Sequence, residues 1–408
     1  MLLNDIVDQL ANIDRCLKRG KILFIRIDIN SPIVNGKIVD DFRIRAHAFT
    51  LRLVSDAGAR AVVLAHQGRP GQDDFTSLEL HKPYLEKHLE RPIKFVDDVT
   101  GPEARRQIKE LRDGEILLLE NVRILSEEVI ERVPEAQAET FLVRKLAPLG
   151  DYFVFDGFAV AHRSQPSVVG FPLVMPSCMG PVFERELRAL STVFEKRGRG
   201  VTLVAGGAKI PDTLKAVEQL LRNGLVEKVA VGGLVGFVFA VAKYGIVNTL
   251  MKQEIEKGGY LPYIERARQI LSKYGSQIQT PIDFAVNQNG RIDVDVYSLA
   301  QPPLDIGRST VLLFKEVIGQ SEIVIFSGPM GYIEDDRFAV GTIELLRSVA
   351  NKRLIIGGGH TILAAEKAGV IDKAYHVSTG GRAFIQTIGG EEMPAVKVLL
   401  TSAKKFWT

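Results

Sequence analysis

Cysteine is scarce in this chain. Only Cys16 and Cys178 occur among 408 residues, far apart in the sequence and without the spacing of metal ligands. A disulfide-rich scaffold or a zinc site would need more cysteines at closer spacing. We therefore expect neither a disulfide framework nor a zinc site, and a reducing cytoplasm fits this composition.

Long hydrophobic runs and an excess of one charge are also missing. The longest apolar stretches, such as 234–242, are too short to cross a bilayer. The first fifteen residues carry Asp5, Asp8 and Asp14 where a signal peptide would be basic and then apolar. The formal net charge is +3, from 52 basic and 49 acidic residues, so no global field favours nucleic acid or a membrane. We expect a soluble, cytoplasmic protein that binds neither.

Short apolar segments alternate with longer amphipathic ones, the pattern of repeated strand and crossover-helix units. With 408 residues, 46% of them hydrophobic, the chain is long enough for two cores. We predict an α/β fold of two doubly wound parallel-sheet, Rossmann-like domains joined by a hinge helix. The predicted strands are 22–27, 61–65, 93–96, 116–119 and 152–155, then 202–205, 228–231, 281–284, 323–326, 354–356 and 375–377.

Proline marks the passage between the two halves. Pro172, Pro176 and Pro181 interrupt the segment 170–181, which precedes a helical stretch at 182–195 and a basic, glycine-rich exit at 196–200. We predict an N-terminal domain at 1–172, a hinge and connecting helix at 173–199, and a C-terminal domain at 200–390.

Basic and polar groups follow the predicted strands of the first half. They lie in five segments that each follow or flank an apolar run: 26–30, 41–44, 66–70, 120–123 and 162–164. Because the carboxyl ends of parallel strands share one sheet edge, we expect these segments to converge there. Arginine forks bind carboxylate and phosphate through two hydrogen bonds each, so the pattern predicts a small, highly charged anion.

Glycine takes the corresponding positions in the second half. Glycine-rich turns follow apolar runs at 206–209, 232–233, 328–331, 357–361 and 379–382. Glycine lets backbone N–H groups approach a phosphate, and a following helix adds partial positive charge. One such turn is weak support because glycine often serves backbone geometry alone. Several together, one with Lys209, favour a polyphosphate nucleotide.

The chain resembles phosphoglycerate kinases of the archaeal type, in motifs that occur in family order along nearly its whole length. The matching strings are Asp28-Ile29-Asn30-Ser31-Pro32, His66-Gln67-Gly68-Arg69-Pro70, Leu119-Glu120-Asn121-Val122-Arg123, Phe155-Asp156-Gly157-Phe158-Ala159 through His162-Arg163, Gly206-Gly207-Ala208-Lys209, Gly328-Pro329-Met330-Gly331 and Val377-Ser378-Thr379-Gly380-Gly381.

For the N-terminal domain the resemblance implies a site for 3-phosphoglycerate or 1,3-bisphosphoglycerate. The residues implied are Asp28, Asn30, Arg43, His66, Arg69, Arg123 and Arg163. Arg43 would lie nearest the transferring phosphoryl group and would be catalytic together with Lys209. Considered one at a time, these side chains have structural explanations that are equally good. Asp28 suits a capping acid, His66 and His162 suit structural histidines, and each arginine suits a surface ion pair.

For the C-terminal domain it implies an ATP or ADP site. The residues implied are Gly206, Gly207, Lys209, Gly232, Gly233, Pro329, Glu334, Gly357, Gly358, Gly359, His360 and Thr361. Lys209 would contact the terminal phosphates and Glu334 the ribose hydroxyls, although Glu334 alone would be interpreted as a solvated acid. Phe237 and Phe239 are candidates for the adenine pocket or for the core.

Three positions depart from the family pattern, all on the nucleotide side. His360 stands where an aspartate linked to the metal is usual, Thr213 replaces a second lysine, and Ser327 replaces an asparagine. Histidine is a poor ligand for magnesium, so we expect Mg²⁺ to be held by nucleotide phosphates and water, with its protein ligand unknown and Asp212 a guess. Lys215 and Arg382 are candidates to replace the missing charge.

The resemblance implies direct in-line transfer after hinge closure, in glycolysis and gluconeogenesis, without a covalent intermediate. The tail 391–408, with Trp407, would pack back on the N-terminal domain; the alternative is a frayed terminus. A nicotinamide-dependent dehydrogenase or a Walker-type ATPase is disfavoured because neither glycine fingerprint occurs. A non-catalytic nucleotide or anion binder remains the third alternative. We expect a monomer, with a homodimer as the other possibility.

Overall fold

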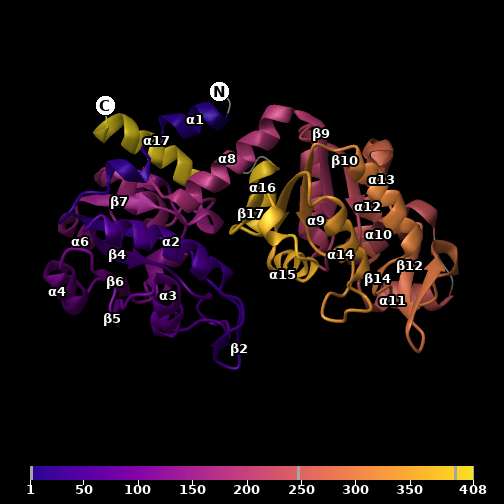
Figure 1. Ribbon diagram of the computed structural model, residues 1–408, viewed down its shortest axis with the longest axis horizontal. Helices are drawn as coiled ribbons and strands as arrows, with labels where there is room; N and C mark the ends of the chain where they lie inside the picture. The colour runs from indigo at the N-terminus through magenta and orange to yellow at the C-terminus, as the bar shows by residue number, and fades with distance from the viewer. Residues whose placement is uncertain (1–2, 246–248, 390–392, 408) are drawn as a thin grey trace. The chain divides into compact units, whose positions relative to one another are not determined.

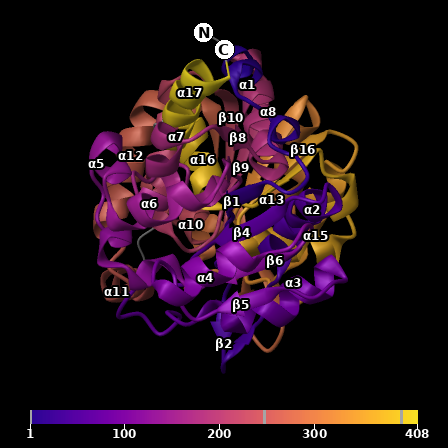
Figure 2. The same cartoon turned by 90° about the vertical axis from the view of Figure 1, so that its left-hand side faces the viewer.

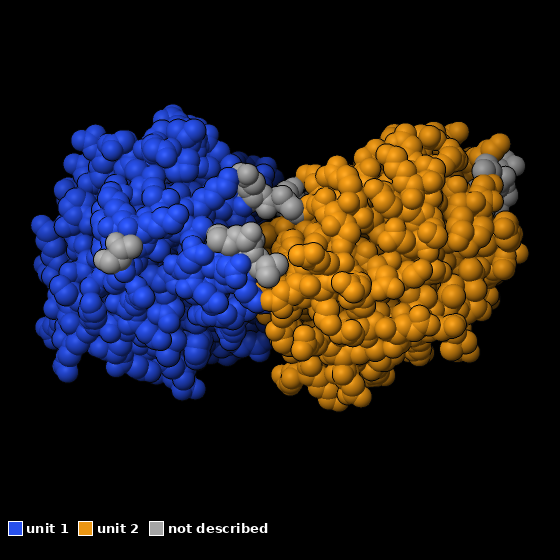
Figure 3. All heavy atoms as spheres, turned by 90° about the horizontal axis from the view of Figure 1, so that it is seen from above, with its two compact units in different colours: residues 1–188, 392–408 blue, residues 189–391 orange. Residues whose placement is uncertain are grey.

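The computed structural model describes residues 3–245, 249–389 and 393–407 (Figure 1). It divides into two compact units: unit 1 comprises Met1–Arg188 and Glu392–Thr408, and unit 2 comprises Ala189–Glu391 (Figure 3). The boundary expected at 390/391 lies outside the described residues. No helix in the described ranges is long and apolar enough to cross a membrane.

Unit 1 is built on a six-stranded parallel sheet of order β5-β6-β4-β1-β7-β8, and Figure 2 shows β1, β4, β6 and β5 side by side. The strands are β1 (Ile22–Arg26), β4 (Arg60–Leu64), β5 (Lys94–Val96), β6 (Ile116–Leu119), β7 (Tyr152–Phe155) and β8 (Ser177–Met179), with a small hairpin of β2 (Ile33–Val34) and β3 (Lys37–Ile38). The helices are α1 (Leu3–Gln9), α2 (Phe42–Asp56), α3 (Lys82–Leu89), α4 (Pro102–Glu110), α5 (Pro134–Ala138), α6 (Phe141–Leu146) and α7 (Phe171–Val174).

Both faces of this sheet are buried, which is why its strands are continuously apolar. Leu23 and Ile25 join Ile44 and Leu51 of α2 in one core cluster. On the opposite face Phe24 packs against Phe171 of α7, with ring centroids 5.6 Å apart. Helices on both faces identify unit 1 as doubly wound.

The segment predicted as hinge contains regular structure. β8 extends the sheet of unit 1 by pairing with β7, and α8 (Pro181–Lys196) follows directly. The sequence analysis misses β8 because three residues between prolines carry no periodic signal. β9 (Gly198–Ala205) begins within the glycine-rich exit at 196–200, four residues before the strand predicted at 202–205.

Unit 2 has a second six-stranded parallel sheet, of order β11-β10-β9-β15-β16-β17. Its strands besides β9 are β10 (Val226–Val231), β11 (Ile278–Gln279), β15 (Ile323–Ser327), β16 (Arg353–Gly357) and β17 (His376–Ser378). Its helices are α9 (Ile210–Arg222), α10 (Gly233–Tyr244), α11 (Thr249–Lys257), α12 (Leu261–Tyr274), α13 (Arg308–Gly319), α14 (Val340–Ser348), α15 (Gly359–Ala368) and α16 (Arg382–Ile388). The two parallel sheets confirm the predicted fold class.

One predicted strand belongs elsewhere. The run predicted at 281–284 lies at the start of β12 (Asp283–Asn287), which pairs antiparallel with β13 (Arg291–Asp295) and β14 (Asp305–Ile306) in a separate three-stranded sheet. The sixth strand of the parallel sheet is β11 instead. A short apolar run carries no information about the direction of its partner strand, so the sequence does not distinguish these cases.

The C-terminal helix α17 (Pro394–Phe406) packs on unit 1, against α7 and β8. Ser402 Oγ accepts a hydrogen bond from Ser177 N at 3.0 Å. The Trp407 indole N–H donates to Ser177 O at 3.0 Å, and its ring stacks on Tyr152 with centroids 5.8 Å apart. The tail therefore closes over the edge strand of the first sheet.

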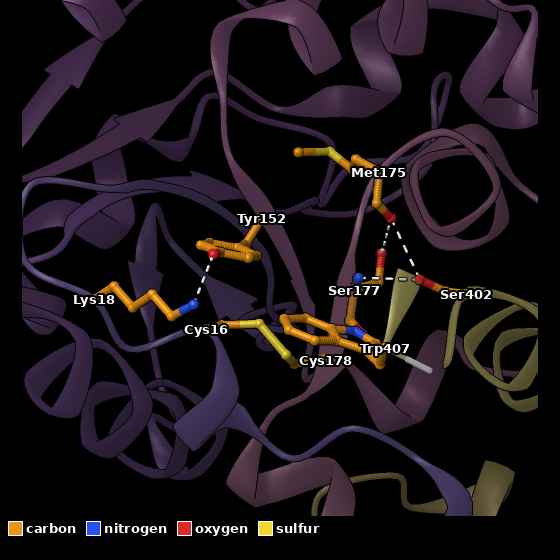
Figure 4. Close-up of a disulfide and its surroundings, with 8 residues drawn as sticks. All are labelled: Cys16, Lys18, Tyr152, Met175, Ser177, Cys178, Ser402 and Trp407. Carbon is orange, nitrogen blue, oxygen red and sulfur yellow. Dashed lines mark hydrogen bonds between the residues drawn. A yellow bond between two sulfur atoms is a disulfide. The ribbon is translucent and has the colours of Figure 1, made fainter. Parts of the chain in front are cut away.

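The sequence analysis suggests no disulfide framework, yet Cys16 and Cys178 form a disulfide (Figure 4). Asn12 forms a parallel bridge with Met179, and Met179 N donates to Ala11 O at 2.8 Å, so the N-terminal segment runs beside β8. This pairing brings together two cysteines 162 positions apart, and both are fully buried. Spacing in the sequence does not reveal a contact that tertiary pairing creates.

We predict that the disulfide stabilises unit 1. In the chain-entropy model, closing a loop of 162 residues stabilises the folded state by about 5 kcal/mol. Cys16→Ser/Cys178→Ser should therefore unfold at clearly lower denaturant concentration, followed by the fluorescence of Trp407, the sole tryptophan. Reductant should shift wild type to the same midpoint and leave the variant unchanged; equal midpoints for oxidised and reduced wild type would contradict the prediction.

We also predict that unit 1 loses stability in acid because of a buried histidine. His81 is fully buried with Nε2 3.0 Å from Gln67 Oε1, and burial lowers its pKa to about 4. The unfolded chain takes up this proton near pH 6.5, so stability falls as pH drops from 6.5 to 4, by about 3 kcal/mol in total. In His81→Gln that part of the loss should be absent from denaturant midpoints measured across this range; an unchanged pH profile would refute the assignment.

Candidate functional site

The residues predicted to bind the glycerate substrate, which is the phosphoryl acceptor, lie at the carboxyl edge of the sheet of unit 1. This edge is called the acceptor edge below. Asp28 and Asn30 follow β1, His66 and Arg69 follow β4, Arg123 follows β6, and Arg163 follows β7. The strand order reverses between β1 and β7, which is where open α/β sheets bind ligands. The structure therefore brings all these side chains to one end of one sheet, together with Arg43 in the first turn of α2.

Asp28 is the acid at the centre of this edge. Its side chain is almost fully buried, and Oδ2 accepts a hydrogen bond from Arg43 Nη1 at 2.9 Å. Burial is the largest single influence and would raise the pKa of Asp28. The charge of Arg43, together with smaller contributions from His66, the N–H of Asn30 and Arg26, outweighs it and lowers the pKa to about 2. Arg43 also donates to Asn30 O at 3.2 Å and keeps about a quarter of its side chain exposed. This arginine is thus oriented by protein groups and still open to a ligand.

Arg123 and Asn30 both contact the loop after β4. Asn30 Oδ1 accepts from Gly68 N at 2.8 Å, and Arg123 Nη1 donates to Gly68 O. Arg123 is largely buried, and burial, followed by the nearby charge of Arg26, lowers its pKa to about 10. The loops after β1, β4 and β6 are therefore fixed relative to one another by the predicted site residues.

Arg26, to which the sequence analysis assigned no role, is fully buried at the end of β1. Its Nη2 lies 3.0 Å from His66 Nδ1, and its Nε donates to Ser167 Oγ at 2.8 Å. Ser167 in turn bonds the buried carboxylate of Glu128. Burial and then Arg26 depress the pKa of His66 well below its usual value, so His66 is neutral near pH 7. Arg26 thereby orients His66.

Arg69 and Arg163 complete the group at its exposed side. Arg69 is exposed, whereas Arg163 is partly buried with Nη1 3.6 Å from Glu131 Oε1. Burial and then the charge of Arg69 lower the pKa of Arg163. The two arginines are thus close enough to repel each other.

Among the charged side chains that act directly on one another at this edge, arginines outnumber acids. Five arginines, namely Arg26, Arg43, Arg69, Arg123 and Arg163, face the three acids Asp28, Glu128 and Glu131. Like charges held at short range cost free energy unless a counter-charge joins them. The arrangement therefore suits a small polyanion with carboxylate and phosphate groups.

Unit 2 contains a cavity of about 580 Å³ at the carboxyl edge of its own sheet. Its strand order reverses between β9 and β15, and the loops after these strands and β16 line the cavity. Helices α9 and α15 begin at its wall, with their N-cap positions at Lys209 and Gly358. N–H groups and partial positive charge at helix N-termini are suited to phosphate.

Glycine is required at the floor of this cavity. Gly328 has φ +90°, and a Cβ there would lie 2.2 Å from Gly206 O. Gly233 has φ +60°, and a Cβ there would lie 2.7 Å from Gly207 N. The loops after β9, β10 and β15 therefore contact one another through backbone atoms, which no side chain would permit. Thr361 Oγ1 reinforces the contact by accepting from Gly328 N at 2.8 Å.

Most of the predicted nucleotide residues line this cavity. They are Gly206, Gly207, Lys209, Gly233, Pro329, Glu334, Gly357, Gly358, Gly359, His360 and Thr361. Gly232 does not line it; it packs against Met330, whose Sδ would lie 2.3 Å from a Cβ. Phe237 and Phe239 are buried in the core, where Phe237 packs edge-on against Phe284.

The apolar wall of the cavity was missed from the sequence. It includes Leu203, the segment 302–304, Tyr332 and Ile385. The Pro302-Pro303 pair was a local signal for a rigid loop, but nothing local says that this loop faces β9 and β15. This wall gives the cavity an apolar side suited to a flat base.

Carboxylates for a metal are few. Asp212, Asp305 and Glu334 line the cavity, and Asp305 is occupied by Arg291 Nη1 at 2.7 Å and Gly341 N at 2.8 Å. His360 Nε2 lies 3.6 Å from Glu334 Oε1. Among the described residues no three His, Cys, Asp or Glu side chains cluster as metal ligands. This donor set fits Mg²⁺ only if phosphates and water supply most of its ligands. The side chain of Arg382 lies outside the described residues.

Comparison with known proteins finds one family along nearly the whole chain. The family model described as phosphoglycerate kinase matches residues 13–391. Phosphoglycerate kinases of Pyrobaculum aerophilum and Sulfurisphaera tokodaii are 84% and 46% identical, covering 100% and 93% of both chains. The crystal structure of phosphoglycerate kinase from Pyrococcus horikoshii OT3 has a TM-score of 0.90 at 37% identity, covering 97% of this chain and 100% of that one. The chain therefore belongs to the phosphoglycerate kinase family, in its archaeal type.

Proposed function

We propose that this phosphotransferase binds the two substrates of its family at the two sheet edges. The family reaction is reversible transfer of a phosphoryl group between 1,3-bisphosphoglycerate and ADP, giving 3-phosphoglycerate and ATP. The glycerate substrate binds at the sheet edge of unit 1, and the nucleotide binds in the cavity of unit 2. The residues that bind the glycerate substrate are Asp28, Asn30, Arg43, His66, Arg69, Arg123 and Arg163. The observation that carries this proposal is the excess of arginines at the edge of unit 1. Neither a dehydrogenase nor a non-catalytic binder is favoured, since the chain belongs to a kinase family.

Arg43 and Lys209 are the catalytic residues of the proposal. A carboxylate oxygen of 3-phosphoglycerate attacks the γ-phosphorus in line, and charge is spread over the equatorial oxygens in the transition state. In unit 1, Arg43 is held by Asp28 and is still partly exposed, so it is assigned to the equatorial oxygens. Lys209 precedes α9 at the nucleotide cavity. Each stabilises charge where it develops, and the protein needs no covalent intermediate.

Mg²⁺ would be held by the nucleotide phosphates and water, with Asp212 as a candidate among the carboxylates that line the cavity. It would neutralise phosphate charge when bound. His360 and Thr213, which line the cavity, support this assignment. A histidine is a poor magnesium ligand, and a threonine brings no positive charge to a phosphate.

Several further assignments belong to the same proposal. The two units close about α8 before transfer, so that water is excluded from an acyl phosphate. The enzyme works in the cytoplasm as a monomer.

Arg43→Ala should lower kcat about 100-fold or more while the KM for ATP stays near that of wild type. The reason is loss of a cation that acts on the transition state. A coupled assay of ATP-dependent phosphorylation of 3-phosphoglycerate measures both constants. Arg45→Ala, on the exposed face of the same helix, is the matched control and should keep kcat within about twofold. Equal effects of the two substitutions would refute a catalytic role for Arg43.

Glu334→Gln should raise the KM for ATP about tenfold and leave the KM for 3-phosphoglycerate unchanged. A hydrogen bond to a charged group contributes roughly 1.5–3 kcal/mol, and this one is assigned to the ribose hydroxyls. Asp336→Asn removes a nearby exposed acid that pairs with Lys367 and should change neither constant. A rise in the KM for 3-phosphoglycerate would place Glu334 outside the nucleotide site.

A further inference from the structure

A buried polar connection in unit 1 lies beside the acceptor edge but belongs to none of its predicted ligands. His47 and Asp156 have no exposed surface, and no role follows for either from the preceding sections. His47 lies on α2 one turn after Arg43. Buried polar side chains cost free energy unless they are hydrogen-bonded, so their partners indicate why they are there.

The hydrogen bonds of His47 specify one tautomer. Asp28 N lies 3.3 Å from His47 Nε2, and a backbone N–H can only donate, so Nε2 accepts. Nδ1 then carries the proton and donates to Asp156 Oδ2 at 3.1 Å. The imidazole therefore links the backbone of Asp28 to the carboxylate of Asp156.

Asp156 carries this link to the start of α8. Its Oδ1 accepts from Val182 N at 2.8 Å and Phe183 N at 3.0 Å, two N–H groups that have no partner within the helix. A carboxylate at a helix N-terminus is also favoured by the helix dipole. Gly180 permits the approach, since a Cβ there would lie 2.3 Å from Asp156 Oδ1.

The helix that Asp156 caps is the one that connects the two units. Residues 181–188 of α8 belong to unit 1, and residues 189–196 belong to unit 2. A continuous series of hydrogen bonds thus runs from Asp28 through His47 and Asp156 to the first turn of α8. All its members lie in unit 1.

We propose that His47 is a positioning residue that couples occupancy of the glycerate site to the first turn of α8. The inference rests on the proposed function, because Asp28 is taken as a substrate ligand. A substrate at the edge must compete for Arg43, which contacts Asp28 Oδ2 at 2.9 Å. Any resulting shift of Asp28 or of α2 changes the contacts of His47, and Asp156 passes that change to Val182 and Phe183.

The experiment is hydrogen exchange of the Val182 and Phe183 amides in the full chain, with and without 3-phosphoglycerate. In wild type the substrate should slow their exchange at least ~3-fold. His47→Leu removes both hydrogen bonds and should abolish this response. His47→Asn keeps a donor where Nδ1 lies but has no acceptor to reach Asp28 N, so it should also abolish the response even if His47→Leu does not fold.

Thr50→Val is the matched control. Thr50 Oγ1 donates to the same Asp156 Oδ2 at 2.5 Å, from the same helix, without touching Asp28. It should keep the substrate response, and its kcat/KM should stay within about twofold, whereas His47→Asn should lose about tenfold. A wild-type response in His47→Asn, or equal loss of response in Thr50→Val, would overturn the coupling.

Binding of 3-phosphoglycerate, measured by calorimetry on the same samples, separates the two ideas. If wild type binds the substrate but exchange at Val182 and Phe183 does not change, the coupling is overturned and the proposed function stands. If wild type does not bind the substrate, both are overturned.

Discussion

The repulsion among arginines at one sheet edge is the constraint around which unit 1 is organised. A parallel sheet directs the carboxyl ends of β1, β4, β6 and β7 to one side, so residues far apart in sequence meet there. Buried Glu128 and Asp28 offset part of the charge and hold Arg26 and Arg43 in fixed positions. The remaining positive charge suits the anionic substrate that we propose for this edge.

The proposed phosphate site of unit 2 has a different chemistry. Its cavity relies on backbone N–H groups and helix N-termini, with Lys209 as the main cation contributed by the motif. Gly206, Gly233 and Gly328 allow three loops to touch through backbone atoms. This explains how the nucleotide side accommodates His360 and Thr213 at positions where the family usually has charged residues, because the helix ends and glycine turns do not depend on those side chains.

The elements around the edge strand β8 are stabilised by long-range contacts. The disulfide joins the N-terminal segment to β8, α17 covers the same strand, and Trp407 stacks on Tyr152. α8, which leads into unit 2, begins directly after β8. Its first turn therefore follows a segment that these contacts hold in place. Hydrogen bonds through His47 and Asp156 connect the first turn of α8 to Asp28 at the acceptor edge.

Sequence alone determined the fold class, nearly all core strands and the two groups of candidate ligands, because apolar periodicity and ordered motifs are local properties. Tertiary structure decided the rest. The 16–178 disulfide, the antiparallel partner strands of β12, the apolar wall at 302–304 and the role of Arg26 all depend on which distant segments become neighbours. The chemistry of a side chain follows from its residue type, which the sequence gives directly. Its partners depend on which distant segments the fold brings beside it.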